Sequence, residues 1–298
     1  MPTATDLQHV EFTRHLDAAP DAVFDRLTNP AHLRAWFAEH AEIEPRVGGA
    51  YRFWGRHTPL VPTPADAAQR LTRFDAGRAI RYEWHWGGSD TEVLIELSSD
   101  ATTAAARTKL WLRHTLIDGT VAGYSRTESD FFAQDFWCVA LANLREHLRT
   151  GKPAIRPDFG DPSDTARVSI EIDAPRERVW HALTDAREMD KWLSKSGVAE
   201  ARVGGAYSYG WNFDGCTCGP TKILEIEPPH RLVHDWFYEP DGARGGASRT
   251  EWVLDALSPT RTRVTITQFA ITSPRNHTGY TGGWAKFAAA LKDLVESK

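Results

Sequence analysis

Two polar residues interrupt otherwise apolar strand faces, and they are the first candidates for chemistry. His114 shares one side of an alternating segment with Leu110 and Leu112, and Gln268 follows Val264 and Ile266 in the same way. A buried polar side chain must find a hydrogen-bond partner. That partner is either a ligand, in which case His114 is a weak candidate for a general base, or a neighbouring residue or water. The sequence leaves both readings open.

Aromatic residues gather on the same predicted strand faces. In the segment 80–86, Tyr82, Trp84 and Trp86 alternate with charged or polar residues, which is typical of a strand with one buried side. Aromatic walls with a few polar points suit a planar apolar ligand, and plain core packing is the alternative. The candidate ligand-binding residues are Phe53, Tyr82, Trp84, Trp86, Leu112, His114 and Phe136 in the first half, and Tyr209, Trp211, His234, Trp236, Trp252 and Gln268 in the second.

Other motifs predict no cofactor. Cys216-Thr217-Cys218, with His234 downstream, lacks the four ligands and the usual Cys-x-x-Cys spacing of structural zinc, so a pair of reduced thiols is expected and no metal. The chain contains no Gly-x-Ser-x-Gly, Gly-x-x-x-x-Gly-Lys or His-Glu-x-x-His motif. No catalytic residue is predicted beyond the weak candidate His114.

The elements that must position these residues occur twice. Val47-Gly48-Gly49-Ala50-Tyr51 returns letter for letter as Val203-Gly204-Gly205-Ala206-Tyr207, an offset of 203 − 47 = 156 residues. A repeat of this length is a whole domain. We expect one domain at 1–152, a linker at 153–165 rich in proline and charge, and a second domain at 166–298. The paired glycines are expected to supply positive φ angles at a tight hairpin turn.

Hydrophobic periodicity gives each half the same order of elements. The first half is expected to run as a strand (9–16), two short helices (20–28, 31–37), the glycine hairpin, strands near 80–86, 92–97 and 109–116, and a long helix (128–148). The second half repeats this order and ends in a helix from about 282 to 296. This order predicts an α+β fold in which a curved antiparallel sheet surrounds a long C-terminal helix.

Charge and composition indicate which classes of binding partner are not expected. The chain has 298 residues, a net charge of −5 and three cysteines. The charge gives no reason to expect nucleic acid. No export signal or run of about 20 apolar residues is present, so no membrane insertion and a cytoplasmic location with reduced thiols are expected.

A family resemblance rests on motifs found in both halves. In the second half these are Asp173-Ala174-Pro175, Val179-Trp180-His181-Ala182-Leu183-Thr184, Trp192, the hairpin Val203–Tyr207, and Gly283-Trp284, read as the opening of the last helix. This pattern resembles the START-like (SRPBCC) superfamily, and more narrowly the branch of the heat-shock ATPase activator homologues. The resemblance implies two tandem helix-grip domains with hydrophobic cavities. It also implies relatives that bind lipids or polyketides, cyclise them, confer antibiotic self-resistance or activate a chaperone.

Three hypotheses for function follow. The first is a non-enzymatic carrier or sequestration protein for a hydrophobic, aromatic or polyketide-like molecule; the resemblance extends this to making or surviving a secondary metabolite such as an enediyne. The second is a cyclase, dehydratase or hydrolase using His114 with Tyr82 or Tyr209, and the third is a chaperone regulator. Trp211 in place of Gly55, and Trp252 in place of Val93, suggest that the second cavity is filled by side chains. The ligand and the choice between monomer and dimer stay open.

Overall fold

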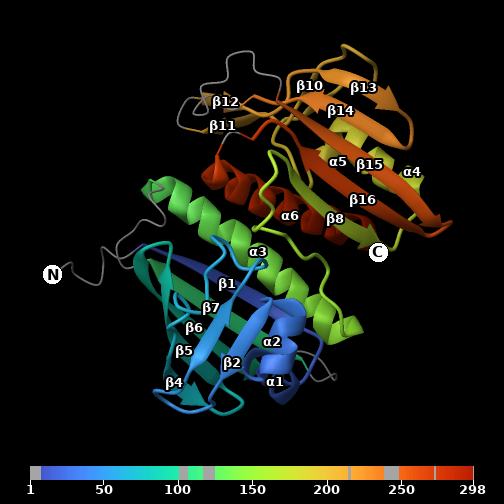
Figure 1. The fold of residues 1–298 in the computed structure, drawn as a ribbon. Coiled ribbons are helices and arrows are strands. Elements are labelled where there is room, and N and C mark those ends of the chain that lie inside the picture. The colour runs from blue at the N-terminus through green and yellow to red at the C-terminus, as the bar shows by residue number, and fades with distance from the viewer. Residues whose placement is uncertain are drawn as a thin grey trace. The chain divides into compact units, whose positions relative to one another are not determined.

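The computed structural model describes residues 8–100, 107–116, 125–213, 216–237, 248–271 and 273–297. The chain divides into two compact units, Met1–Gly160 (unit 1) and Asp161–Lys298 (unit 2). Each unit contains a five-stranded antiparallel sheet and one long helix (Figure 1). The predicted α+β fold with two tandem helix-grip domains is confirmed.

Unit 1 builds its sheet in the order β1-β7-β6-β5-β4, with β2 and β3 as a separate hairpin. Figure 1 shows α3 running along this sheet. The elements are β1 (Gln8–Leu16), α1 (Pro20–Thr28), α2 (Pro30–Trp36), β2 (His40–Ile43), β3 (Tyr51–Trp54), β4 (Leu71–Asp75), β5 (Ala79–Trp86), β6 (Ser89–Ser99), β7 (Thr108–Leu116) and α3 (Arg126–Thr150).

Unit 2 repeats this plan with the sheet order β13-β14-β15-β16-β8, and α6 takes the place of α3. The elements are β8 (Ala166–Ile172), α4 (Arg176–Thr184), α5 (Ala186–Met189), β9 (Val198–Ala199), β10 (Tyr207–Ser208), β11 (Trp211–Phe213), β12 (Cys216–Cys218), β13 (Ile223–Glu227), β14 (Arg231–Asp235), β15 (Arg249–Ser258), β16 (Arg261–Gln268) and α6 (Pro274–Glu296).

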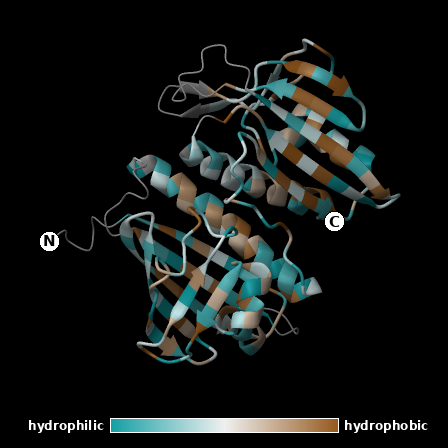
Figure 2. Cartoon of the chain, viewed as in Figure 1, coloured by the Kyte–Doolittle hydropathy of each residue, from teal (hydrophilic) through white to brown (hydrophobic). Residues whose placement is uncertain are grey.

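Strand alternation and helix caps explain these elements locally. Hydrophobic and hydrophilic residues alternate along the strands (Figure 2), and on β5 the even-numbered positions from 80 to 86 are buried. Helix α3 begins at a capping box in which Ser125 and Glu128 each satisfy a backbone N–H of the other. It ends at Gly151, whose φ of 78° is the left-handed conformation that glycine adopts without strain.

The glycine hairpin differs from its prediction in one respect. Gly48 and Gly204 have φ angles of 76° and 74°, as expected for a turn, but the glycines that follow them do not have positive φ. A Cβ on Gly49 would lie 2.3 Å from the Glu44 carbonyl oxygen, and one on Gly205 would lie 2.2 Å from that of Glu200. The second glycine is therefore required by close backbone packing rather than by its dihedral angles.

Helix α6 is longer than predicted. It begins at Pro274, behind the N-cap Ser273, so Trp284 lies inside the helix and does not open it. Gly279, Gly282 and Gly283 weaken the helical signal of this stretch. Tertiary contacts of its aromatic residues, among them Trp236–Tyr280 and Trp236–Trp284, compensate for the low propensity.

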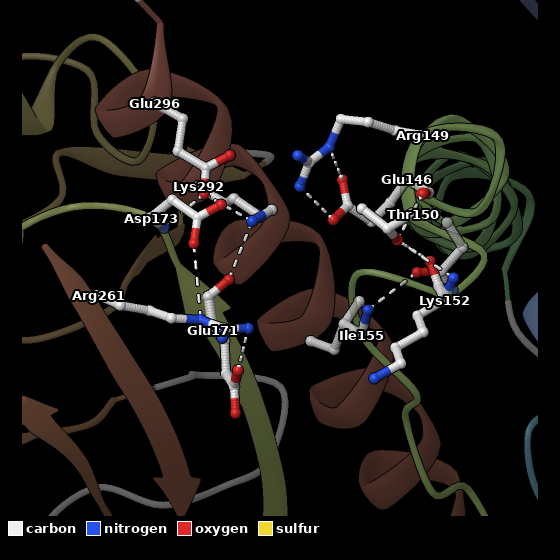
Figure 3. A network of polar contacts seen from close by, with 11 residues as sticks. Glu146, Arg149, Thr150, Lys152, Ile155, Glu171, Asp173, Arg261, Lys292 and Glu296 are labelled. Atoms are coloured by element: carbon white, nitrogen blue, oxygen red, sulfur yellow. Dashed lines mark hydrogen bonds and ion pairs between the residues drawn. The ribbon is translucent and has the colours of Figure 1, made fainter. Parts of the chain in front are cut away.

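The residues after α3 pack on unit 1. The backbone N–H of Ile155 donates to Asn143 Oδ1 at 3.0 Å, and Arg156 donates to the backbone oxygens of Arg34 and Ala38 beside the end of α2. Figure 3 shows Ile155 together with Thr150 and Lys152 at the end of α3. The predicted boundaries at 152 and 165 stay a prediction.

No helix in the described ranges is long and apolar enough to cross a bilayer.

Candidate functional site

Strand register shows which residues of the two units are equivalent. One row across the sheet of unit 1 consists of Leu71, Tyr82, Val93, His114 and Val10. The same row in unit 2 consists of Ile223, His234, Thr250, Gln268 and Ala166. His114 and Gln268 are thus equivalent, as the sequence suggested.

The strand register shows that the predicted equivalence of Trp252 with Val93 is wrong. Trp252 pairs with Leu232 and Ile266, in the row that corresponds to Ile95 with Ile80 and Leu112. Trp252 therefore replaces Ile95, and Thr250 replaces Val93. The two-residue error arose because the loops before the paired strands differ in length, so no single sequence offset holds along the chain.

The predicted site residues of unit 1 come together in one buried group. We define the aromatic cluster of unit 1 as Phe53, Tyr82, Trp84, Trp86, His114, Phe132, Phe136 and Trp137, each at most 7% exposed. Neighbouring rings are in contact: the centroids of Trp84 and Trp86 are 4.8 Å apart, and those of Phe53 and Trp84 are 5.0 Å apart. Leu112 is also fully buried, one row away on β7. Much of the interior is filled by the protein's own side chains.

His114 is held within this cluster by one hydrogen bond, one stacked ring and one tilted ring. Trp137 Nε1 on α3 donates to His114 Nδ1 at 3.0 Å. The imidazole lies 5.4 Å from the Trp84 ring at an interplanar angle of 11°, and 5.1 Å from the Trp86 ring. Burial lowers the pKa of His114 to about 3, so the ring is neutral at physiological pH.

These contacts fix the tautomer of His114. An indole N–H only donates, so Nδ1 must carry the lone pair and Nε2 the proton of the neutral ring. Nε2 is buried and has no hydrogen-bond partner within the described part of the chain. Trp86 Nε1, on the ring beside it, is a second buried donor in the same condition. The cluster thus contains two N–H groups that form no hydrogen bond with the described residues.

Unit 2 has a histidine in the same row, at the position equivalent to Tyr82, and both nitrogens of this His234 ring have partners. His234 Nδ1 lies 2.7 Å from the backbone oxygen of Asp235, so it carries the proton and donates. Nε2 then accepts from the Tyr209 hydroxyl at 2.9 Å and from Trp252 Nε1 at 3.2 Å. Burial is the main cause that lowers the pKa of His234, to about 4. Every hydrogen-bonding atom of this ring has a partner.

The remaining candidates of unit 2 also have partners. Gln268 Oε1 accepts from the Thr250 hydroxyl at 2.6 Å, and its Nε2 donates to Ser248 Oγ at 2.8 Å. The half-buried Trp211 donates to the backbone oxygen of Leu193 and stacks on Phe287 with centroids 5.1 Å apart. Trp236 Nε1 donates to the Tyr280 hydroxyl at 3.0 Å. One indole N–H of this unit, on the buried Trp284, has no partner among the described residues.

Acid–base chemistry finds little support in these environments. The lone pair of His114 Nδ1 accepts the hydrogen bond from Trp137, so Nε2 of the neutral ring can only donate. Burial raises the pKa of Tyr82 and of Tyr209 well above the usual value, so both phenols stay neutral. Neither histidine nor tyrosine is poised to remove a proton from a substrate near pH 7.

Sequence reasoning missed part of the site. Trp137 and Phe132 belong to the aromatic cluster of unit 1, and Trp284 contacts Trp236 and Trp252 in unit 2. Trp137 and Trp284 were visible as the first members of equivalent helical stripes. Nothing in strand or helix spacing indicates that the Trp137 indole reaches His114.

Two further features of the described residues concern metal binding and a polar pocket at the surface of unit 1. Among the described residues, no group of three or more His, Cys, Asp or Glu side chains could hold a metal ion. Cys218 is buried, whereas the side chain of Cys216 lies outside the described residues. A polar hollow of about 500 Å³ in unit 1 is lined in part by Glu42, Arg52 and Arg70, and none of its lining residues belongs to the aromatic cluster.

The chain is similar to several solved structures. DynU16, a protein in the dynemicin biosynthetic locus, is 16% identical with a TM-score of 0.41, and the match covers 97% of each chain. The di-domain ARO/CYC BexL from the BE-7585A biosynthetic pathway is 15% identical with a TM-score of 0.36, covering 98% of this chain and 99% of BexL. CV1439 from Chromobacterium violaceum is 29% identical with a TM-score of 0.36, covering 45% of this chain and 99% of that one.

No curated protein matches the sequence. The family described as Activator of Hsp90 ATPase homolog 1-like protein matches residues 17–149 and 173–296, one segment in each unit. These two segments make up most of the chain and contain both glycine hairpins and both long helices. The protein belongs to the Activator of Hsp90 ATPase homolog 1-like family, with the family's domain present twice.

Proposed function

We propose that unit 1 binds a hydrophobic, aromatic small molecule against its aromatic cluster. The observation that carries this proposal is the buried Nε2–H of His114, which has no hydrogen-bond partner in the described part of unit 1 and lies among aromatic rings. Leaving a buried donor without a partner costs about 1–3 kcal/mol. A ligand that stacks on the indoles and accepts this hydrogen bond removes that cost.

The comparison with unit 2 supports unit 1 as the binding unit. Unit 2 satisfies His234 and Gln268 internally. It also places the stacked pair Trp211 and Phe287 where the repeat has Gly55 and Ala140 in unit 1. In unit 2, side chains fill this space and form these hydrogen bonds. In unit 1, a ligand would fill the corresponding space and accept the remaining hydrogen bond.

The alternatives are less well supported. A cyclase, dehydratase or hydrolase needs a proton acceptor, and the basic nitrogen of His114 already accepts from Trp137. The family's name does not assign chaperone activation to this chain, because function resides in sites rather than in folds. A role in making or surviving a secondary metabolite, and a cytoplasmic location, stay predictions.

A titration of the full chain with polycyclic aromatic compounds tests the proposal. Trp84, Trp86 and Trp137 all belong to the cluster, so a bound ligand should change the intrinsic tryptophan fluorescence in a saturable way. Ala140→Phe adds a ring on the buried face of α3 and should abolish saturation. Gln134→Phe, at an exposed position of the same helix, is the matched control and should leave the titration unchanged.

The outcomes separate clearly if circular dichroism shows that both variants fold. Saturable binding that only Ala140→Phe removes supports the site. Absence of saturation by any compound, or equal binding by wild type and Ala140→Phe, would sink the proposal.

A further inference from the structure

Trp137 makes one nitrogen of His114 an obligatory donor. The indole N–H occupies Nδ1 at 3.0 Å, and the lowered pKa keeps the ring neutral. Without Trp137 the neutral imidazole could place its proton on either nitrogen and present either a donor or an acceptor at Nε2. With Trp137 in place, only the Nε2–H tautomer makes this hydrogen bond.

The surroundings of His114 are uncharged as well as apolar. The rings in contact with it are those of Trp84, Trp86 and Trp137, and the neutral phenol of Tyr82 lies in the same sheet row. Burying a charged ligand group here without a counter-charge would cost several kcal/mol. A ligand is therefore expected to be neutral where it meets His114.

From these points we infer, resting on the function proposed above, that unit 1 selects neutral planar aromatic molecules that bear a carbonyl oxygen, such as polycyclic ketones or quinones. The carbonyl accepts from His114 Nε2–H, and the aromatic rings stack on the tryptophans. Trp137 is the positioning residue because it fixes the tautomer without touching the carbonyl. The unpaired Nε1–H of Trp86 gives a second acceptor oxygen a place to bind.

The experiment uses two probes of nearly identical shape, 9-fluorenone and fluorene, and equilibrium dialysis against the full chain. Wild type should bind the ketone about 3- to 10-fold more tightly than the hydrocarbon, the range expected for one buried neutral hydrogen bond. His114→Leu should remove this preference while both compounds still bind.

A conservative variant tests the donor itself. His114→Gln should keep the preference, because a glutamine amide can accept from Trp137 with its oxygen and donate to the carbonyl with its nitrogen. Glutamine already occupies the equivalent position 268 in unit 2. His85→Leu, on the exposed face of β5, is the matched control and should change neither affinity.

Trp137→Phe tests the positioning role. Nitrogen NMR of the histidine ring should show only the Nε2–H tautomer in wild type and a mixture in this variant, together with a smaller preference for the ketone.

Each outcome decides the matter. Binding of neither probe overturns this inference, whereas the titration with other polycyclic aromatic compounds decides the proposed function. Equal binding of both probes, or a preference that survives His114→Leu, overturns the inference and leaves the proposed function standing. An Nδ1–H tautomer in wild type overturns it independently of any binding measurement.

Discussion

The two units place a histidine in the same row of the same sheet topology and treat it differently. In unit 2, His234 on β14 has a partner for each nitrogen, and all of them are within that unit. In unit 1, His114 on β7 has a partner for Nδ1, and its Nε2 has none among the residues that the structure describes. A duplicated fold can thus keep its architecture while one copy pairs both nitrogens of a buried histidine and the other leaves one histidine N–H without a partner among the described residues.

The first prediction has the largest expected effect, and it tests how much the aromatic core stabilises unit 2. Trp252→Ala removes a fully buried indole that packs against Trp192 and Trp284 and donates to His234. We expect the free energy of unfolding of unit 2 to fall by about 3–5 kcal/mol, as for other large-to-small core truncations. Urea denaturation combined with amide hydrogen exchange would assign the loss to unit 2.

Trp111→Ala is the control, because Trp111 is only half-buried, on the outer face of β7. A loss below about 1 kcal/mol is expected there, typical of surface positions. Equal losses for the two variants would contradict the view of unit 2 as a self-filled core.

The second prediction compares the two histidines directly. His234→Leu removes three hydrogen bonds, those with the Tyr209 hydroxyl, Trp252 Nε1 and the Asp235 carbonyl oxygen, whereas His114→Leu removes the one from Trp137 Nε1. At about 1 kcal/mol for each buried hydrogen bond lost, we expect His234→Leu to cost about 3 kcal/mol and His114→Leu about 1 kcal/mol. Urea denaturation of the two variants measures this, and the reverse order would break the comparison.

Much of the fold could be predicted from the sequence, because strand alternation and helical stripes report burial directly. The even-numbered face of β5 and the stripe of α3 from Trp137 to Leu148 are examples. The start of α6 could not be predicted, since its glycines lower local propensity and tertiary packing decides. The role of Gly49 was missed for a similar reason, because backbone closeness leaves no periodic signal.

The sequence predicted which residues lie in the candidate site of unit 1, but not the hydrogen bond that joins its helix to its sheet. All the predicted residues of unit 1 are buried, and its predicted aromatics contact one another through their rings. The hydrogen bond from Trp137 to His114 joins α3 to β7 across 23 positions, and the spacing of either element says nothing about it. The difference between a satisfied and an unsatisfied histidine is therefore visible only in three dimensions.

The third prediction concerns pH. An unfolded histidine takes up a proton near pH 6.5, whereas the pKa of folded His234 is about 4 and that of folded His114 about 3. Below pH 6.5 the unfolded state binds more protons, so stability falls as pH falls. Between pH 7 and 5, each histidine should contribute a loss of about 2 kcal/mol.

Denaturation curves of wild type, His114→Gln and His234→Gln measure these contributions by difference. The difference is needed because burial also lowers the pKa of His57 and of His147 in unit 1. Each variant should have a shallower dependence on pH than wild type. The contribution of His234 should end near pH 4, whereas that of His114 should continue toward pH 3. If the variants had the same pH dependence of stability as wild type, the two histidines would not be buried as neutral rings.

The smallest expected effect lies at the ends of the two long helices (Figure 3). In unit 2, the buried Lys292 donates to the backbone oxygen of Glu171 at 3.0 Å and to Glu296 at 2.6 Å, and Glu296 also accepts from the Asp173 N–H. In unit 1, Arg149 pairs with Glu146, three residues earlier, and its side chain is 56% exposed. The first pair ties α6 to the end of β8, whereas the second pair lies within α3.

Lys292→Met should therefore destabilise unit 2 by about 1–2 kcal/mol, because it leaves a carboxylate and a carbonyl without their shared donor. Arg149→Met should change the stability of unit 1 by less than about 0.5 kcal/mol, as exposed ion pairs usually do. Hydrogen exchange at the ends of α3 and α6 distinguishes the two, since only the α6 end should open more often. If hydrogen exchange increased equally at both helix ends, the stability of unit 2 would depend on its aromatic core and not on the contacts of Lys292.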